Sequence, residues 1–325
     1  MINKIKVGII GGAGYTAGEL IRVLLNHPSA ELIFVHSKSN AGKSIDSVHK
    51  DLKGETVLSF VDAITQEIDV LFLCVGQGEA KQFLAENQMA ERIKIIDLSQ
   101  DFRLGEKMNG RTFVYGLPEL NREAIKAAHN IANPGCFATA IQLGLLPLAK
   151  AGLLEEVYTT GITGSTGAGQ GVALTSHFSW RANNVQAYKT LRHQHIKEII
   201  LSLSQLQKGE NIGVHFVPWR GDFTRGIYVS STVDCNLPFA EVEQLYKTFY
   251  QDHPFTIVSD AMIDLKMVVN TNKCLLHLEK EESKLVIHSA IDNLLKGASG
   301  QAVQDMNLLF GLEETEGLKL KANYF

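Results

Sequence analysis

The chain has 325 residues, of which 45% are hydrophobic and 20% charged, and its formal net charge is −4. This composition is typical of a globular protein with room for two domains. So mild a charge, without any run of basic residues, argues against a nucleic-acid or membrane surface. No stretch approaches the roughly 18 apolar residues of a membrane-spanning helix.

The cysteines and the N-terminal residues bear on the compartment. Four cysteines lie far apart, and no two of them have the C-x-x-C spacing of a zinc or redox site. This usage favours a reducing compartment over a disulfide framework. The first residues lead at once into a predicted strand, so we expect no signal peptide and a cytoplasmic protein.

A glycine-rich segment follows the first predicted strand, residues 7–10, and precedes an amphipathic helix through residues 19–25. Glycines at such a junction let backbone N–H groups approach a pyrophosphate at the helix N-terminus. Gly12-x-Gly14-x-x-Ala17 fits the dinucleotide fingerprint. The alternative is a glycine-rich turn without a ligand. The residues predicted to bind the dinucleotide here are Gly11, Gly12, Ala13, Gly14, Tyr15 and Thr16.

Further strand patterns at residues 31–36, 69–74 and 93–98 alternate with helical patterns. That alternation predicts a doubly wound parallel sheet, an α/β domain of the Rossmann type.

The end of the second strand indicates which dinucleotide is bound. Enzymes selective for NAD usually carry Asp or Glu there to hold the ribose hydroxyls. This chain instead has Ser37, Lys38 and Ser39, and Glu31 begins the strand, where it is badly placed for the ribose. Hydroxyls and lysines suit a 2′-phosphate, so we predict NADP as the cofactor. The alternative is that the lysines only solvate a loop.

Cys136 follows a Pro134-Gly135 break and precedes an apolar run that predicts a buried helix over residues 138–146, ended by Pro147. The thiol is therefore expected at or just before a helix N-terminus. There the unpaired N–H groups and the helix dipole favour thiolate over thiol. We predict a nucleophile; the alternative is a small buried hydrophobic residue.

After Cys136 the pattern changes to longer alternating strands, at residues 156–162, 213–218, 225–235, 273–278 and 284–291, with helices at 194–207 and 240–250. This predicts an inserted α+β domain with a mainly antiparallel sheet. Residues 297–309 predict an amphipathic helix that packs on the first domain. The expected division is 1–135 with 297–325 for NADP binding, and 136–296 for catalysis and dimerisation.

Several segments together resemble one known family. Besides the glycine loop and residues 131–147, they are 97–104 (DLSQDFRL), 115–119 (YGLPE), 164–169 (GSTGAG), 193–199 (HQHIKEI), 224–227 (TRGI) and 292–298 (DNLLKGA). In this order they resemble the N-acetyl-γ-glutamyl-phosphate reductases of arginine biosynthesis, which are related to the aspartate-semialdehyde dehydrogenases.

The resemblance implies that NADPH reduces an acyl phosphate to an aldehyde in two stages. The thiolate of Cys136 attacks the γ-carbonyl carbon and phosphate leaves, giving a thioester that then accepts hydride. The family's histidine pair aligns with His193 and His195, one of which is expected to be the acid/base. Their spacing does not decide between them. A metal site at this pair is the alternative, but no third ligand stands out, and we expect no metal.

The resemblance also implies binding residues. Arg103 and Arg225 are expected to clamp anionic groups of the substrate through paired hydrogen bonds, and the alternative for each is a plain ion pair. Ser165 and Gly167 match a family loop near cofactor and thioester, where a plain tight turn is the alternative. Asn293 matches an asparagine beside the nicotinamide amide; the alternative is a helix cap.

One departure from the family concerns residues 176–188, which carry Trp180 and Arg181 before the histidine pair. An added cation there could bind a second carboxylate, which makes an N-succinyl substrate an alternative to the N-acetyl one. An aspartate-semialdehyde dehydrogenase and a non-enzymatic NADP-binding regulatory protein are two further candidates. The family also implies a homodimer or homotetramer.

Overall fold

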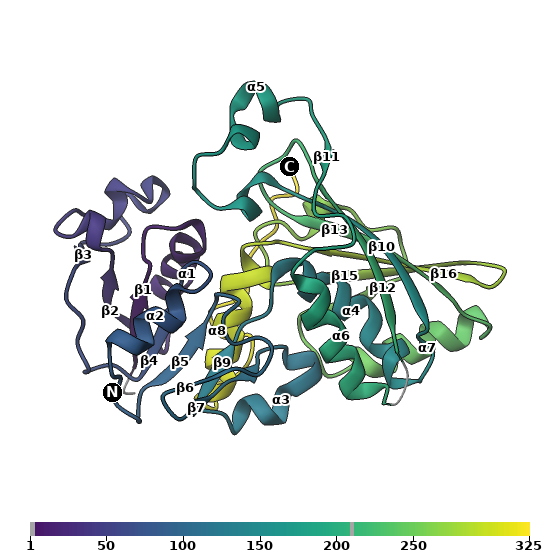
Figure 1. Cartoon of the computed structure of the whole chain (residues 1–325), viewed down its shortest axis with the longest axis horizontal. Coiled ribbons are helices and arrows are strands. Elements are labelled where there is room, and N and C mark those ends of the chain that lie inside the picture. Colours follow the sequence, from purple (N-terminus) through teal and green to yellow (C-terminus); the bar gives the residue numbers. More distant parts are fainter. Residues whose placement is uncertain (1–3, 209–210) are drawn as a thin grey trace. The chain divides into compact units, whose positions relative to one another are not determined.

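The computed structural model describes residues 4–208 and 211–325 and groups the chain into two units (Figure 1). The first unit consists of Met1–Pro134 and Ala298–Lys319, and the second of Gly135–Gly297 and Leu320–Phe325. The sequence-based division placed the whole C-terminal tail in the first domain. For residues 320–325 this is wrong, because the second unit binds the tail: the Asn270 side chain donates to the Lys321 carbonyl, and the Val269 carbonyl accepts from Asn323 N–H.

The sheet of the first unit has seven strands, and every neighbouring pair in it is parallel. Its order is β3-β2-β1-β4-β5-β9-β8. From β1 the chain adds β2 and β3 on one side and then crosses over to add β4 and β5 on the other, so the predicted doubly wound sheet is confirmed. The strands are β1 (Ile5–Ile10), β2 (Ala30–His36), β3 (Phe60–Val61), β4 (Val70–Leu73), β5 (Lys94–Asp97), β8 (Val114–Tyr115) and β9 (Asn130–Ala132). A short hairpin of β6 (Lys107–Met108) and β7 (Arg111–Thr112) precedes β8.

Apolar runs explain the central strands, since all four residues of β4 are buried on both faces of a parallel sheet. The helices of this unit are α1 (Tyr15–Leu25), α2 (Glu79–Glu86), α3 (Pro118–Lys126) and α8 (Gly300–Leu309), with 3₁₀ turns η1 (Lys38–Asn40), η2 (Ile45–Ser47) and η3 (Lys50–Leu52). The prediction of an amphipathic α8 is wrong. Every residue of α8 is buried, because the helix contacts both α1 and α3 and has no solvent-facing side.

The sheet of the second unit also has seven strands, in the order β11-β12-β10-β13-β16-β15-β14. Four neighbouring pairs are antiparallel, and the pairs β10–β12 and β14–β15 are parallel, which confirms the predicted mainly antiparallel sheet. The strands are β10 (Glu156–Thr163), β11 (Gln186–Ala187), β12 (Gly213–Arg220), β13 (Ile227–Asp234), β14 (Thr256–Ser259), β15 (Cys274–Glu281) and β16 (Lys284–Ile291).

Alternate residues of β10 are buried, as expected for a strand with one face against helices. The helices of this unit are α4 (Cys136–Lys150), α5 (Phe178–Arg181), α6 (His195–Leu206) and α7 (Phe239–Tyr250). Helix α4 contacts α6, α7, β13 and β16 and is the buried centre of the unit. Shorter turns are η4 (Ser165–Ala168), η5 (Leu174–Ser176) and η6 (Leu265–Met267), and the π-helical turn η7 (Leu295–Ser299) leads into α8.

Pro147 does not end helix α4, contrary to the prediction, because the helix continues to Lys150. A proline lacks the N–H that would bond to the carbonyl of Leu143, four residues earlier. In the structure the hydroxyl of Tyr250 on α7 donates to that carbonyl, and the hydroxyl of Tyr246 donates to the neighbouring Gly144 carbonyl at 2.6 Å. Tertiary hydrogen bonds thus replace the one that the proline removes.

No helix among residues 4–208 and 211–325 has the length and apolar character needed to cross a membrane.

Candidate active site and dinucleotide-binding loop

Cys136 is the first residue of α4, so the prediction that it lies at a helix N-terminus is confirmed. The N-cap is Gly135, in an extended conformation and without a side-chain cap bond. Cys136 is half-buried, and its Cβ packs so closely on Gly297 that a Cβ added to that glycine would lie 2.8 Å away. The thiol therefore sits where the first N–H groups of a 15-residue helix point outward.

Glu198 and His195 lie directly against Gly135. The carboxylate of Glu198 accepts a hydrogen bond from Gly135 N–H at 3.2 Å, and its other oxygen, Oε1, lies 3.7 Å from Nε2 of His195. A Cβ at Gly135 would meet that Nε2 at 2.3 Å, so only glycine fits before the cysteine. Both side chains come from the first turn of α6 and are buried. Sequence reasoning missed Glu198, although its spacing of three from His195 places both side chains on one helix face.

His193 lies beside His195 but in a different environment. Its ring packs against the rings of Phe137, Tyr188 and Phe216, and its centroid is 4.5 Å from that of His195. Its Nδ1 accepts a hydrogen bond from His195 N–H at 3.3 Å. Burial, followed by the neighbouring charges of His195 and Lys189, lowers the pKa of His193 to about 3. His193 is therefore neutral at physiological pH, whereas His195 faces a carboxylate.

Arg225 forms an ion pair within the second unit. Its Nη2 lies 2.8 Å from Oδ2 of Asp292, whose side chain is fully buried. Asp292 also accepts hydrogen bonds from the backbone N–H groups of Asn270, Leu294 and Leu295. The ion-pair alternative for Arg225 thus describes a contact that the structure contains.

Asn293 links two loops. Its Oδ1 accepts from Gly226 N–H at 2.7 Å, and its Nδ2 donates to the Thr166 hydroxyl at 3.0 Å. Thr166 lies on η4 between Ser165 and Gly167, and that turn is tied by its backbone to Phe223 and Thr224. The side chain of Asn293 therefore bridges η4 to the residues before β13, and it makes these bonds instead of capping a helix.

Arg103 belongs to the first unit. Its Nε donates to the Asn133 carbonyl at 2.8 Å and its Nη2 to the Leu98 carbonyl at 3.1 Å. The side chain thus stabilises the loop that follows β9 and leads toward Cys136 in the sequence.

The glycine loop of the first unit has the close backbone packing that the fingerprint predicts. Gly11 has a φ of +78°, and a Cβ there would lie 2.3 Å from the Cys74 carbonyl oxygen. Gly12 N–H donates to the His36 carbonyl, and the Gly12 carbonyl accepts a bond from His49 at 2.7 Å. Helix α1 begins directly afterwards with Gly14 as N-cap and no side-chain cap bond. Ala13 belongs to this turn, and Tyr15 and Thr16 are the first two residues of α1, where the N–H groups suit a pyrophosphate.

The predicted 2′-phosphate residues lie together on η1, directly after β2. Asn40 donates to the hydroxyls of Ser37 and Ser39, at 3.2 Å each, and accepts from Lys43 at 3.3 Å. Lys38 is exposed on the same turn. Sequence reasoning did not single out Asn40, which organises the cluster.

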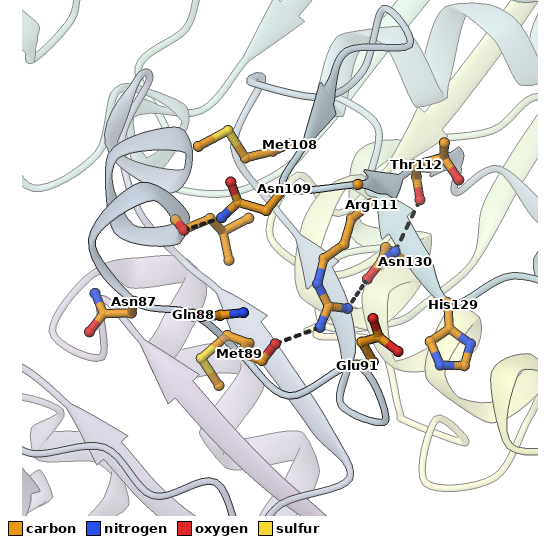
Figure 2. A pocket seen from close by; sticks show the side chains of 12 residues that line it. Asn87, Gln88, Met89, Glu91, Met108, Asn109, Arg111, Thr112, His129 and Asn130 are labelled. Atoms are coloured by element: carbon orange, nitrogen blue, oxygen red, sulfur yellow. Dashed lines mark hydrogen bonds between the residues drawn. The ribbon is translucent and has the colours of Figure 1, made fainter.

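A cavity of about 410 Å³ lies elsewhere in the first unit (Figure 2). Its lining residues lie at or before the starts of β5, β8 and β9. The cavity is therefore at the N-terminal ends of the parallel strands, whereas the glycine loop follows the C-terminal end of β1. Figure 2 shows the Arg111 guanidinium directed at the Met89 carbonyl and the Asn130 side chain. It also donates to the carbonyls of Ile93 and Ala90. These bonds tie the strand starts together, and they are structural.

Comparison with known proteins identifies both units. Residues 6–128 match the family described as "Semialdehyde dehydrogenase, NAD binding domain", and residues 136–293 match "Semialdehyde dehydrogenase, dimerisation domain". The first unit is thus the binding domain for a nicotinamide dinucleotide.

Curated relatives match over their full length and over 99% of this chain. Proteins named N-acetyl-gamma-glutamyl-phosphate reductase from Christiangramia forsetii and Parabacteroides distasonis are each 56% identical to it, and one from Flavobacterium johnsoniae is 52% identical.

Solved structures share the fold at much lower identity. Aspartate semialdehyde dehydrogenase II from Vibrio cholerae has a TM-score of 0.72 at 19% identity, covering 95% of this chain and 99% of that one. Aspartate semialdehyde dehydrogenase with NADP from Candida albicans has a TM-score of 0.69 at 13% identity, with the same coverage.

Proposed function

We propose, from the premise that the chain belongs to the N-acetyl-gamma-glutamyl-phosphate reductase family, that it catalyses the reaction for which the family is named. It reduces N-acetyl-γ-glutamyl phosphate to N-acetyl-glutamate 5-semialdehyde and phosphate in arginine biosynthesis. The observation that carries the covalent route is the placement of Cys136 at the start of α4, next to the His195–Glu198 pair.

Cys136 is the nucleophile. The helix N-terminus stabilises its thiolate, whose sulfur attacks the γ-carbonyl carbon of the acyl phosphate. A C–S bond forms, the C–O bond to phosphate breaks, and phosphate leaves with the bonding electron pair. The product is a thioester on Cys136, which is more readily reduced than an ester.

His195 is the acid/base. Hydride addition to the thioester carbon leaves a negative charge on its oxygen, to which protonated His195 donates a proton. The same proton must leave again as the C–S bond breaks and the aldehyde forms. His195 takes that proton while the thiolate of Cys136 is regenerated. Glu198 orients His195 and stabilises its protonated form. His193 remains neutral and holds the backbone of His195 through its Nδ1 acceptor.

The glycine loop fits a dinucleotide, because Gly11 and Gly12 admit no side chain and α1 begins with uncapped N–H groups. When bound, the nicotinamide cofactor supplies the hydride. We assign the pyrophosphate to Gly11, Gly12, Ala13, Gly14, Tyr15 and Thr16. Ser37, Lys38 and Ser39 hold a 2′-phosphate, which makes the cofactor NADP. Ser165, Gly167 and Asn293 form the loop contacts on the nicotinamide side.

Arg103 and Arg225 bind anionic groups of the substrate. Each guanidinium is positioned by the protein, through the carbonyls of Leu98 and Asn133 for Arg103 and through Asp292 for Arg225. A guanidinium held in this way has a fixed orientation, and its planar fork of N–H groups suits a phosphate or carboxylate.

The second unit matches a dimerisation domain, and its sheet is the contact surface of a homodimer or homotetramer. The division between an NADP-binding unit and a catalytic unit, and a cytoplasmic location, belong to the same proposal.

The reverse reaction tests the function. Phosphate-dependent reduction of NADP by N-acetyl-glutamate 5-semialdehyde is expected for the wild-type protein and should vanish in Cys136→Ala. Cys235→Ala removes a buried thiol of the same unit and serves as the matched control. Activity that survives Cys136→Ala contradicts the covalent route. If aspartate semialdehyde reduces NADP and N-acetyl-glutamate 5-semialdehyde does not, the assigned substrate is contradicted.

A further inference from the structure

Arg181, at the end of α5, is a buried cation whose donors are only partly used. Its side chain is 8% exposed. Its Nη2 donates to the Asn184 carbonyl at 2.8 Å and to the Arg220 carbonyl at 3.4 Å. Among residues 4–208 and 211–325, no acceptor binds its Nε or Nη1. A buried charge with unsatisfied N–H groups is costly, so these donors call for an acceptor from outside the chain.

Arg220, at the end of β12, adds a second guanidinium. Its Nε is also buried without an acceptor among the described residues, and its Nη1 reaches the Thr175 hydroxyl only at 3.4 Å. The nearby carboxylate of Asp222 accepts from the Asn183 backbone N–H at 2.6 Å. Within the described part of the chain neither arginine has an ion pair. Two positive charges therefore gather here, and neither of them is paired with the nearby Asp222.

Tyr188 connects these arginines to the nucleophile. The Arg220 guanidinium lies over the Tyr188 ring, 5.0 Å from its centroid, and the His193 ring contacts the same tyrosine at 5.8 Å. Burial raises the pKa of Tyr188, the charge of Cys136 raises it further, and Arg220 lowers it. The His193 ring also contacts the ring of His195, which lies against Gly135, so a chain of ring contacts leads from Arg220 to the residue before Cys136.

We propose that Arg181 and Arg220 form a carboxylate-binding subsite of the substrate pocket, with Tyr188 as its wall. This inference rests on the proposed function, whose substrate carries two anionic groups. The phosphate is bonded to the carbon that Cys136 attacks and departs in the first step. The carboxylate lies several bonds from that carbon and stays on the product. A guanidinium fits a carboxylate through parallel hydrogen bonds, and the buried setting strengthens them.

The carboxylate can have two sources. One is the α-carboxylate of the glutamyl group, which every N-acyl substrate has. The other is a terminal carboxylate on the acyl group, as in an N-succinyl substrate, which would bring one carboxylate for each arginine. The two sources predict different responses to the same substitutions.

The test measures kcat and KM in the phosphate-dependent reverse reaction with N-acetyl- and N-succinyl-glutamate 5-semialdehyde. The variants are Arg181→Gln, Arg181→Lys and Arg220→Gln. Lys247→Gln removes an exposed positive charge of the same unit and is the matched control. Loss of a charge-assisted hydrogen bond predicts that KM rises about 10- to 100-fold in Arg181→Gln, while kcat changes little. Arg181→Lys should show a smaller rise in KM than Arg181→Gln. If Arg181→Gln does not fold, Arg220→Gln tests the same subsite and should also raise KM.

The pattern of KM values assigns the source. A rise for both semialdehydes supports the α-carboxylate, and a rise confined to the N-succinyl compound supports the acyl carboxylate. Unchanged KM values for both compounds overturn the inference, as does a loss of kcat alone with a lowered melting temperature. If the wild-type protein turns over neither compound, the proposed function itself fails, which is a distinct result.

Discussion

Glu198 accepts a hydrogen bond from the backbone N–H of Gly135, the residue immediately before Cys136, at 3.2 Å. The two residues are 63 positions apart, and the bond is buried. Because the second oxygen of Glu198 lies 3.7 Å from His195 Nε2, one carboxylate contacts both the residue before Cys136 and the proposed acid/base, His195. The first turn of α6 therefore fixes both Glu198 and His195 next to the start of α4.

Replacing this carboxylate should lower the rate without unfolding the protein. In Glu198→Gln the amide oxygen can still accept from Gly135, but the negative charge beside His195 is lost. We expect kcat to fall by about 10- to 100-fold, because the proposed acid/base loses its close charge partner. Steady-state kinetics measure this, with Glu241→Gln on the surface of α7 as control. An unchanged kcat and pH–rate profile would show that Glu198 has only a structural role.

The two histidines should differ sharply. His195→Gln removes the proposed acid/base, and we expect a loss of about 10²- to 10⁴-fold in kcat. His193→Gln should cost much less. Since the pKa of His193 is already lowered to about 3, the acidic limb of the pH–rate profile should not shift in that variant. A larger loss for His193 than for His195 would reverse the assignment.

Tyr250 should contribute to stability, because its hydroxyl donates to the Leu143 carbonyl, which Pro147 leaves without a backbone donor. Tyr250→Phe leaves the Leu143 carbonyl buried without the donor that Pro147 cannot provide. A buried unsatisfied carbonyl predicts a loss of about 1 to 3 kcal/mol in the free energy of unfolding. Thermal or denaturant unfolding measures it, and the double variant Tyr250→Phe with Pro147→Ala should recover part of the loss. No recovery would mean that the hydroxyl acts through other contacts.

Cofactor preference should depend on η1. Lys38→Gln removes a positive charge from the turn that we assign to the 2′-phosphate, so KM for NADPH should rise by about tenfold while KM for NADH stays the same. Lys50→Gln, on the exposed face of η3, is the matched control. Equal effects on both cofactors would contradict a 2′-phosphate site.

Asp97, at the end of β5, should make stability depend on pH. Burial raises the pKa of this carboxyl to about 7, although hydrogen bonds from Ser99 oppose the rise. The folded state therefore binds a proton between about pH 4 and 7 that the unfolded chain has lost. The stabilisation from this group is complete below about pH 4 and is lost as the pH rises through 7. As the pH rises from about 4 to 7, the unfolding free energy of the wild type should therefore fall relative to that of Asp97→Asn. A constant difference would refute the raised pKa.

Much of the fold follows from local sequence patterns. The alternation at β10, the apolar run at β4 and the Pro134-Gly135 break before α4 each depend on residues close together in the chain. Those patterns correctly predicted a parallel sheet, a mainly antiparallel sheet and a cysteine at a helix start. Short edge strands such as β11 and β14 were not predicted, because two to four residues carry too little periodicity.

Two errors have the same origin. Pro147 read alone ends a helix, and the polar residues of α8 read alone indicate a solvent-facing side. In the structure Tyr250 provides the missing donor to α4, and α1 and α3 enclose α8. Neighbours distant in sequence overrode the local pattern in both cases.

The sequence by itself determined the two domain types, the place of Cys136 at a helix start and the residues available for chemistry, because strand periodicity, glycine spacing and helix starts are local. Only the tertiary structure decided how those residues are used. It placed Glu198 against Gly135, enclosed His193 among aromatic rings and left His195 beside a carboxylate. Identical residue types two positions apart thus acquire different electrostatics, since two of the rings that bury His193, those of Phe137 and Phe216, come from elements far away in the chain.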